Sequence, residues 1–111
     1  FVGLAIDHKT GKMLLSTTYG GVSGPAIKPL ALAKIYKIYQ KIKIPIIGVG
    51  GISSFEDIIQ FMRVGSTMVQ IGTLNYRDPL KISSFYNKLE SFLKNNKISK
   101  IYDLVGDCIE G

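Results

Sequence analysis

Cysteine, histidine and tryptophan are almost absent from this sequence. Its 111 residues include one cysteine, one histidine and no tryptophan. Because the single cysteine, Cys108, forms no internal disulfide, we expect an intracellular, cytoplasmic protein. We expect Cys108 to be inert and His8, in a turn beside Lys9, to be exposed to solvent. No cluster of His, Cys and carboxylate residues stands at metal-ligand spacing, so no metal site is predicted.

Long apolar runs and acidic residues are also scarce. No stretch approaches the ~20 apolar residues of a membrane span, and 14 Lys and Arg against 8 Asp and Glu give a net charge of +6. A basic balance can indicate nucleic-acid binding. Here, however, Lys34, Lys37 and Lys41 recur at helical spacing opposite isoleucines, which is typical of the solvated face of an amphipathic helix. We therefore expect neither a nucleic acid nor a membrane as partner.

The clearest pattern in the chain lies between residues 44 and 73. An apolar run, Ile44–Val49, ends in Gly50-Gly51, a helical pattern follows, and a second apolar run, Thr67–Ile71, ends in Gly72-Thr73. A length of about 30 residues is that of one βαβ unit. The apolar residues are continuous rather than alternating, which predicts strands buried on both faces, as in parallel sheets covered by helices.

Both predicted strands end in glycine, at the edge where α/β folds place their sites. Without a Cβ, backbone N–H groups can approach an anion closely, and the N-terminus of a following helix favours negative charge. The two turns therefore predict a phosphate-binding site. From spacing alone, the alternative that these glycines only make tight turns stays open, because the pattern is neither a Walker nor a Rossmann fingerprint.

The other expected elements are short. Residues 1–6 are predicted to form a buried strand and residues 13–17 a second one, joined as a hairpin through a turn. Helices are expected over residues 30–42, 54–64 and 78–95, with a last short one capped by Ser99. Leu74–Arg77 is expected to be a loop.

Two details of the predicted helices and loops bear on function. A capping box over Ser53–Glu56 is expected to begin the helix at 54–64, with Glu56 and Asp57 complementing its dipole. The segment Tyr19–Lys28 has three glycines, more than a connection needs. We expect that loop, with Ser23 as a helix cap, to contact a flat ligand or an anion.

The motifs then become specific. Residues 20–32, GGVSGPAIKPLAL, closely resemble the loop and helix after strand six of class 1 dihydroorotate dehydrogenases. Ile44–Ile52 resembles their seventh strand and Val69–Thr73 their eighth, and the SGPAIKP form is most similar to subclass 1B. The resemblance implies an α/β fold, the C-terminal part of a (β/α)8 TIM barrel with about strands 6–8 and their helices. Residues 1–111 are then expected to be the C-terminal portion of a single flavin-binding domain, cut from a longer polypeptide.

The resemblance also implies a function. The cofactor is FMN, and the reaction is the NAD-linked oxidation of (S)-dihydroorotate to orotate in de novo pyrimidine (UMP) biosynthesis. By matching motif positions, Gly24 contacts FMN through its backbone, and Gly50, Gly51, Gly72 and Thr73 hold the flavin phosphate. The implied partners are an iron–sulfur FAD electron-transfer subunit and a second catalytic subunit in a homodimer.

The resemblance does not extend to catalytic residues. The family's active-site cysteine, its flavin-contacting lysine and its orotate-binding asparagines belong to earlier strands, and Cys108 does not lie at the position of the base. We therefore expect no catalytic residue in this segment. Three alternatives stay open: the flavin domain of a dihydropyrimidine dehydrogenase, a sugar-phosphate-binding barrel enzyme, and a non-catalytic module that kept the phosphate site.

Overall fold

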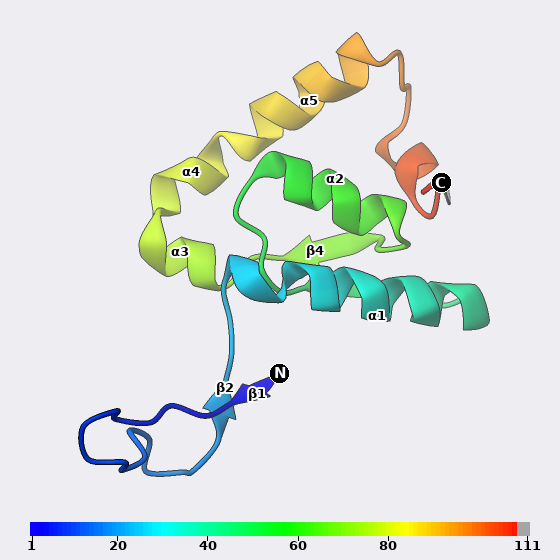
Figure 1. Cartoon of the computed structure of the whole chain (residues 1–111). Helices are drawn as coiled ribbons and strands as arrows, with labels where there is room; N and C mark the ends of the chain where they lie inside the picture. The colour runs from blue at the N-terminus through cyan, green and yellow to red at the C-terminus, as the bar shows by residue number, and fades with distance from the viewer. Residues whose placement is uncertain (109–111) are drawn as a thin grey trace.

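A two-stranded parallel sheet joined by a helix lies at the centre of the molecule (Figure 1). The computed structural model describes residues 1–108, with the backbone alone at Asn75 and Tyr76. Strand β3 (Ile47–Val49) leads through α2 (Phe55–Arg63) to β4 (Met68–Gln70), in a register that places Gly48 opposite Val69. The predicted βαβ unit is confirmed, although both strands are shorter than expected.

Helices cover one face of this sheet. Helix α1 (Lys28–Lys41) and α2 pack on the face that carries Gly48 and Val69, around a core whose buried members are Ala31, Ile35, Ile52 and Phe61. On the other face Ile47, Val49 and Met68 are each more than half exposed. The expectation of burial on both faces is therefore wrong for residues 1–108. Alternate side chains point to opposite faces of a strand, and no described element covers the second face.

The N-terminal residues form a separate antiparallel hairpin. Strand β1 (Val2–Gly3) pairs with β2 (Gly20–Gly21), and an isolated bridge joins Ile6 to Met13. The predicted hairpin is confirmed, but the predicted burial of residues 1–6 is wrong, since Val2 is 78% exposed. Figure 1 shows the loop of the hairpin projecting away from the helices, and Leu4 and Ile6 are also exposed.

The segment after β4 is helical almost throughout. It forms α3 (Thr73–Arg77), α4 (Pro79–Ser83) and α5 (Phe85–Asn95), so the expected loop at 74–77 is a helix. Asp78 caps α4, its side chain accepting a hydrogen bond from Lys81 N at 3.3 Å. The single helix expected over 78–95 is broken at Ser84, whose hydroxyl donates to the Lys81 carbonyl at 2.7 Å and competes with the helical pattern.

A 3-10 turn closes a second core at the far end of α2. This turn, η2 (Ile101–Leu104), buries Leu104 against Ile59 and Met62 of α2. It begins after Lys100 without a side-chain cap, so the predicted cap at Ser99 is wrong. Within residues 1–108, no helix has both the length and the apolar content that crossing a membrane requires.

Candidate functional site

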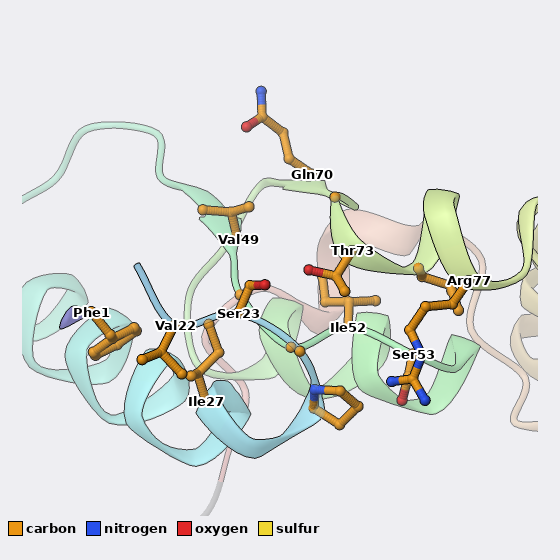
Figure 2. A pocket seen from close by; sticks show the side chains of 16 residues that line it. Phe1, Val22, Ser23, Ile27, Val49, Ile52, Ser53, Gln70, Thr73 and Arg77 are labelled. Atoms are coloured by element: carbon orange, nitrogen blue, oxygen red, sulfur yellow. The ribbon is translucent and has the colours of Figure 1, made fainter. Parts of the chain in front are cut away.

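A cleft opens where the carboxyl ends of β3 and β4 meet the start of α1 (Figure 2). Its volume is about 340 Å³. Three segments that are distant in the sequence contribute to it, residues 22–27, 49–53 and 70–77, together with Phe1. The five residues predicted to bind the cofactor all line it: Gly24, Gly50, Gly51, Gly72 and Thr73.

The turn after β3 requires glycine for its backbone. Gly50 and Gly51 have φ angles of 127° and 77°, a region that side chains rarely adopt. A Cβ on Gly51 would stand 2.7 Å from the Lys28 nitrogen and 2.9 Å from the Gly24 carbonyl oxygen. Gly51 therefore joins the turn after β3 to the loop before α1, in addition to lining the cleft.

Gly24, before α1, and Gly72, after β4, each border open space in the cleft. A Cβ placed on Gly24 or on Gly72 would meet no heavy atom within 4 Å. Gly72, with φ −107° and ψ −79°, also has a backbone conformation that other residues tolerate. At these two positions the bare backbone faces free space, which a bound group can approach closely.

A buried carboxylate caps the helix that follows β3. The Asp57 side chain accepts hydrogen bonds from Ser54 N at 3.1 Å, from Ser53 N at 2.9 Å and from the Ser53 hydroxyl at 3.1 Å. Its other oxygen accepts from Lys28 Nζ at 2.6 Å. The capping box thus pairs Ser54 with Asp57, one residue later than the expected pairing of Ser53 with Glu56. A 3-10 turn, η1 (Pro25–Ile27), precedes α1; its N-cap is Gly24, with no side-chain hydrogen bond, so Ser23 is not a cap.

These contacts keep Asp57 ionised. Burial raises the pKa of its carboxyl, but the hydrogen bonds from Lys28 and Ser53 and the charge of Lys28 outweigh it and lower the pKa below 3.8. The N-terminus of α2 therefore already faces a negative charge at neutral pH, paired with an ammonium group.

The helix termini after the two strands consequently offer little to a second anion. The dipole of α2 is complemented by Asp57, and α3 has only five residues, too few to sum a sizeable dipole. The contribution expected from these termini to anion binding is therefore reduced by Asp57 at α2 and small at α3. The groups left in the cleft to bind an anion are the backbone N–H groups of the glycine turns and the polar side chains that line it.

One of those side chains, Arg77, was missed by sequence reasoning. It lines the cleft from the last turn of α3, four residues after Thr73. Residues four apart lie on one face of a helix, so Arg77 belongs beside Thr73 only if residues 73–77 are helical. Predicting a loop there concealed that spacing, which was the available signal.

The cysteine and the histidine lie outside the cleft. Cys108 N donates to the Arg63 carbonyl at 3.0 Å, at the end of α2 opposite the capping box. His8 is exposed in the turn of the hairpin, as expected. The described residues contain no group of three His, Cys, Asp or Glu side chains that could hold a metal ion.

The sequence is similar to that of dihydroorotate dehydrogenases. Residues 1–93 match the family described as dihydroorotate dehydrogenase. The catalytic subunit of dihydroorotate dehydrogenase B (NAD(+)) from Malacoplasma penetrans is 45% identical over 105 residues, 95% of this chain and 34% of that protein. Its counterpart from Porphyromonas gingivalis is 41% identical over 109 residues, 98% of this chain and 36% of that protein. The chain thus spans about a third of the length of these relatives.

A solved structure shares the fold. The dihydroorotate dehydrogenase of Eimeria tenella, determined in complex with ferulenol, superposes with a TM-score of 0.73 over 95% of this chain and 29% of that one, at 22% identity. The matches do not favour the sugar-phosphate and dihydropyrimidine dehydrogenase alternatives. Since the family match covers residues 1–93 of 111, this chain belongs to the dihydroorotate dehydrogenase family.

Proposed function

We propose that residues 1–111 supply the FMN phosphate site of a dihydroorotate dehydrogenase. The observation that carries the proposal is the convergence of Gly24, Gly50–Gly51 and Gly72–Thr73 on one cleft at the carboxyl ends of two parallel strands. FMN would supply the redox chemistry of the dihydroorotate oxidation. The residues of this chain bind and orient it.

The cleft fits a phosphate group in two respects. Open space over Gly24 and Gly72 lets a ligand reach the backbone, and a Cβ at either position would occupy that space. A volume of about 340 Å³ also lies within the range of ligand pockets. We propose that the backbone N–H groups of the glycine turns and the Thr73 hydroxyl donate to the phosphate oxygens.

The proposal for the whole protein follows the relatives. We propose a (β/α)8 barrel in which this chain provides about strands 6–8, and which oxidises (S)-dihydroorotate to orotate in pyrimidine biosynthesis in the cytoplasm. The base and the substrate-binding residues come from segments outside residues 1–111. The relatives are named NAD(+)-linked catalytic subunits, which supports an iron–sulfur FAD electron-transfer subunit as partner, and we propose that the catalytic subunits form a homodimer.

The spectrum of the purified full-length protein tests this function. We expect flavin absorbance bands, FMN as the flavin released on denaturation, and bleaching of those bands on anaerobic addition of dihydroorotate. A protein that purifies without flavin and does not take up added FMN would refute the proposal.

Gly72→Val is expected to weaken FMN retention by the full-length protein at least about tenfold. The valine side chain would enter the open space over the backbone, while the φ angle and the lack of neighbours leave the fold unstrained. Flavin occupancy after dialysis and the melting temperature of the apoprotein are the measurements.

Gly51→Val provides the contrast. It should lose flavin and also lower the apoprotein melting temperature, because its side chain would meet the backbone of Lys28 and Gly24. If Gly72→Val retained FMN like the wild type, Gly72 would not belong to the site.

Cys108→Ser is expected to leave the turnover of the full-length enzyme nearly unchanged. The thiol lies at the end of α2 opposite the capping box and does not line the cleft. Steady-state turnover with dihydroorotate measures the effect. A loss of about 100-fold or more, the scale of general-base effects, would contradict this expectation.

A further inference from the structure

The cleft has one charged side chain among its described lining residues, Arg77. Lys28, at the start of α1, is paired with Asp57 at 2.6 Å, and the Lys34 ammonium lies over the Phe1 ring, 4.5 Å from its centroid. Among the described residues, Arg77 takes part in neither of the two ion pairs, which join Lys28 to Asp57 and Arg63 to Asp107. A guanidinium without a carboxylate partner therefore stands at the rim of a site lined otherwise by neutral side chains.

The position of Arg77 relates it directly to the glycine turn after β4. Gly72 precedes α3, Thr73 begins it, and Arg77 lies one helical turn later on the face of Thr73. Figure 2 shows the Arg77 side chain extending from α3, and both Arg77 and Ser53, which follows β3, line the cleft. The Ser53 hydroxyl is already bound to Asp57 at 3.1 Å, whereas the Arg77 guanidinium takes part in neither ion pair of the described residues.

A phosphate monoester needs such a donor at this cleft. It has between one and two negative charges at neutral pH, and the dipole of α2 is already complemented by Asp57. A planar guanidinium donates two parallel hydrogen bonds to phosphate oxygens, with more geometric specificity than an ammonium group.

We propose that Arg77 is a cofactor-positioning residue whose guanidinium binds the phosphate of the flavin. The inference rests on the proposed function and adds to it a charged side chain that discriminates phosphorylated from unphosphorylated flavin. Riboflavin has the same ring system and ribityl chain as FMN but no phosphate, so Arg77 acts on one ligand and not on the other.

The test compares the two flavins on the apo form of the full-length protein. FMN and riboflavin are titrated separately, and binding is followed by quenching of flavin fluorescence. Arg77→Gln is expected to weaken FMN binding about tenfold and to change riboflavin binding by less than about twofold. Arg63→Gln is the matched control, because it also removes one positive charge, but from the last turn of α2, outside the cleft. It should leave the affinities for FMN and for riboflavin unchanged.

The salt dependence of FMN binding and the conservative variant Arg77→Lys separate a direct charge contact with the phosphate from a purely structural role of Arg77. Raising the salt from about 0.05 to 0.5 M should weaken FMN binding less in Arg77→Gln than in the wild type, because the screened charge is gone. Arg77→Lys keeps the charge and should fall between the two proteins. Unchanged FMN binding in Arg77→Gln, or an equal loss of both flavins, would overturn the role of Arg77 alone. A wild-type protein that binds neither flavin would overturn the proposed function, and this inference with it.

Discussion

Asp57→Ala is expected to lower the free energy of unfolding of the full-length protein by about 3 kcal/mol. The substitution would leave the Lys28 ammonium without its partner at 2.6 Å and the N–H groups of Ser53 and Ser54 without their acceptor. It would also remove the side chain that ties the start of α1 to the start of α2. Denaturant unfolding of the wild-type and variant proteins measures the difference.

Glu56→Ala is the matched control for Asp57→Ala. Glu56 is an acidic residue in the same first turn of α2, but it is exposed. Its loss affects only the helix dipole, so we expect less than about 1 kcal/mol. Equal effects of the two substitutions would show that Asp57 acts as dipole complement alone.

The contribution of Asp57 should also depend on pH in one direction. Although burial raises the pKa, the Lys28 and Ser53 contacts hold it below the unfolded value of 3.8. The folded state therefore binds the proton less readily than the unfolded state, and the stabilisation is complete above that unfolded value. It is lost as the pH falls through the folded pKa. The stability difference between wild type and Asp57→Ala should accordingly narrow under acid conditions; a difference that widened there would contradict this assignment.

Residues 1–111 expressed alone are expected to aggregate or remain partly folded, to bind FMN poorly and to be inactive toward dihydroorotate. Ile47, Val49 and Met68 are each more than half exposed on one face of the sheet, and burial of each such side chain is worth roughly 1.5–3 kcal/mol. The two-stranded sheet also leaves both edges unpaired among the described residues. The free energy of unfolding of a whole domain is only about 5–15 kcal/mol, so losing the burial of these side chains is enough to prevent stable folding of the isolated segment.

Thermal unfolding, sedimentation and flavin stoichiometry measure this outcome, with the full-length protein as the control. The full-length protein should melt cooperatively with bound FMN. If the isolated segment were monomeric, melted sharply and bound one FMN per chain, residues 1–111 would be a self-sufficient flavin-binding domain.

The capping box illustrates what local sequence leaves undecided. Ser53–Glu56 and Ser54–Asp57 both have the spacing of a capping box. The second is formed because Lys28, distant in the sequence, reaches the Asp57 carboxylate at 2.6 Å. Which acid is buried therefore depends on how α1 packs against α2, and the spacing of the residues contains no information about that packing.

The sequence by itself determined the βαβ unit over residues 44–73 and the resemblance to the family, and that resemblance named five of the residues that line the cleft: Gly24, Gly50, Gly51, Gly72 and Thr73. The βαβ unit and the matching motifs can be recognised from the sequence because apolar runs, glycine turns and helical spacing are patterns of residues that are close together in the chain. Only the tertiary structure decided that Asp57 is buried and paired with Lys28, that residues 73–77 form a helix placing Arg77 at the cleft, and that Ile47, Val49 and Met68 are exposed. Burial and charge pairing depend on which elements come to lie against each other, and residues far apart in the chain settle that together.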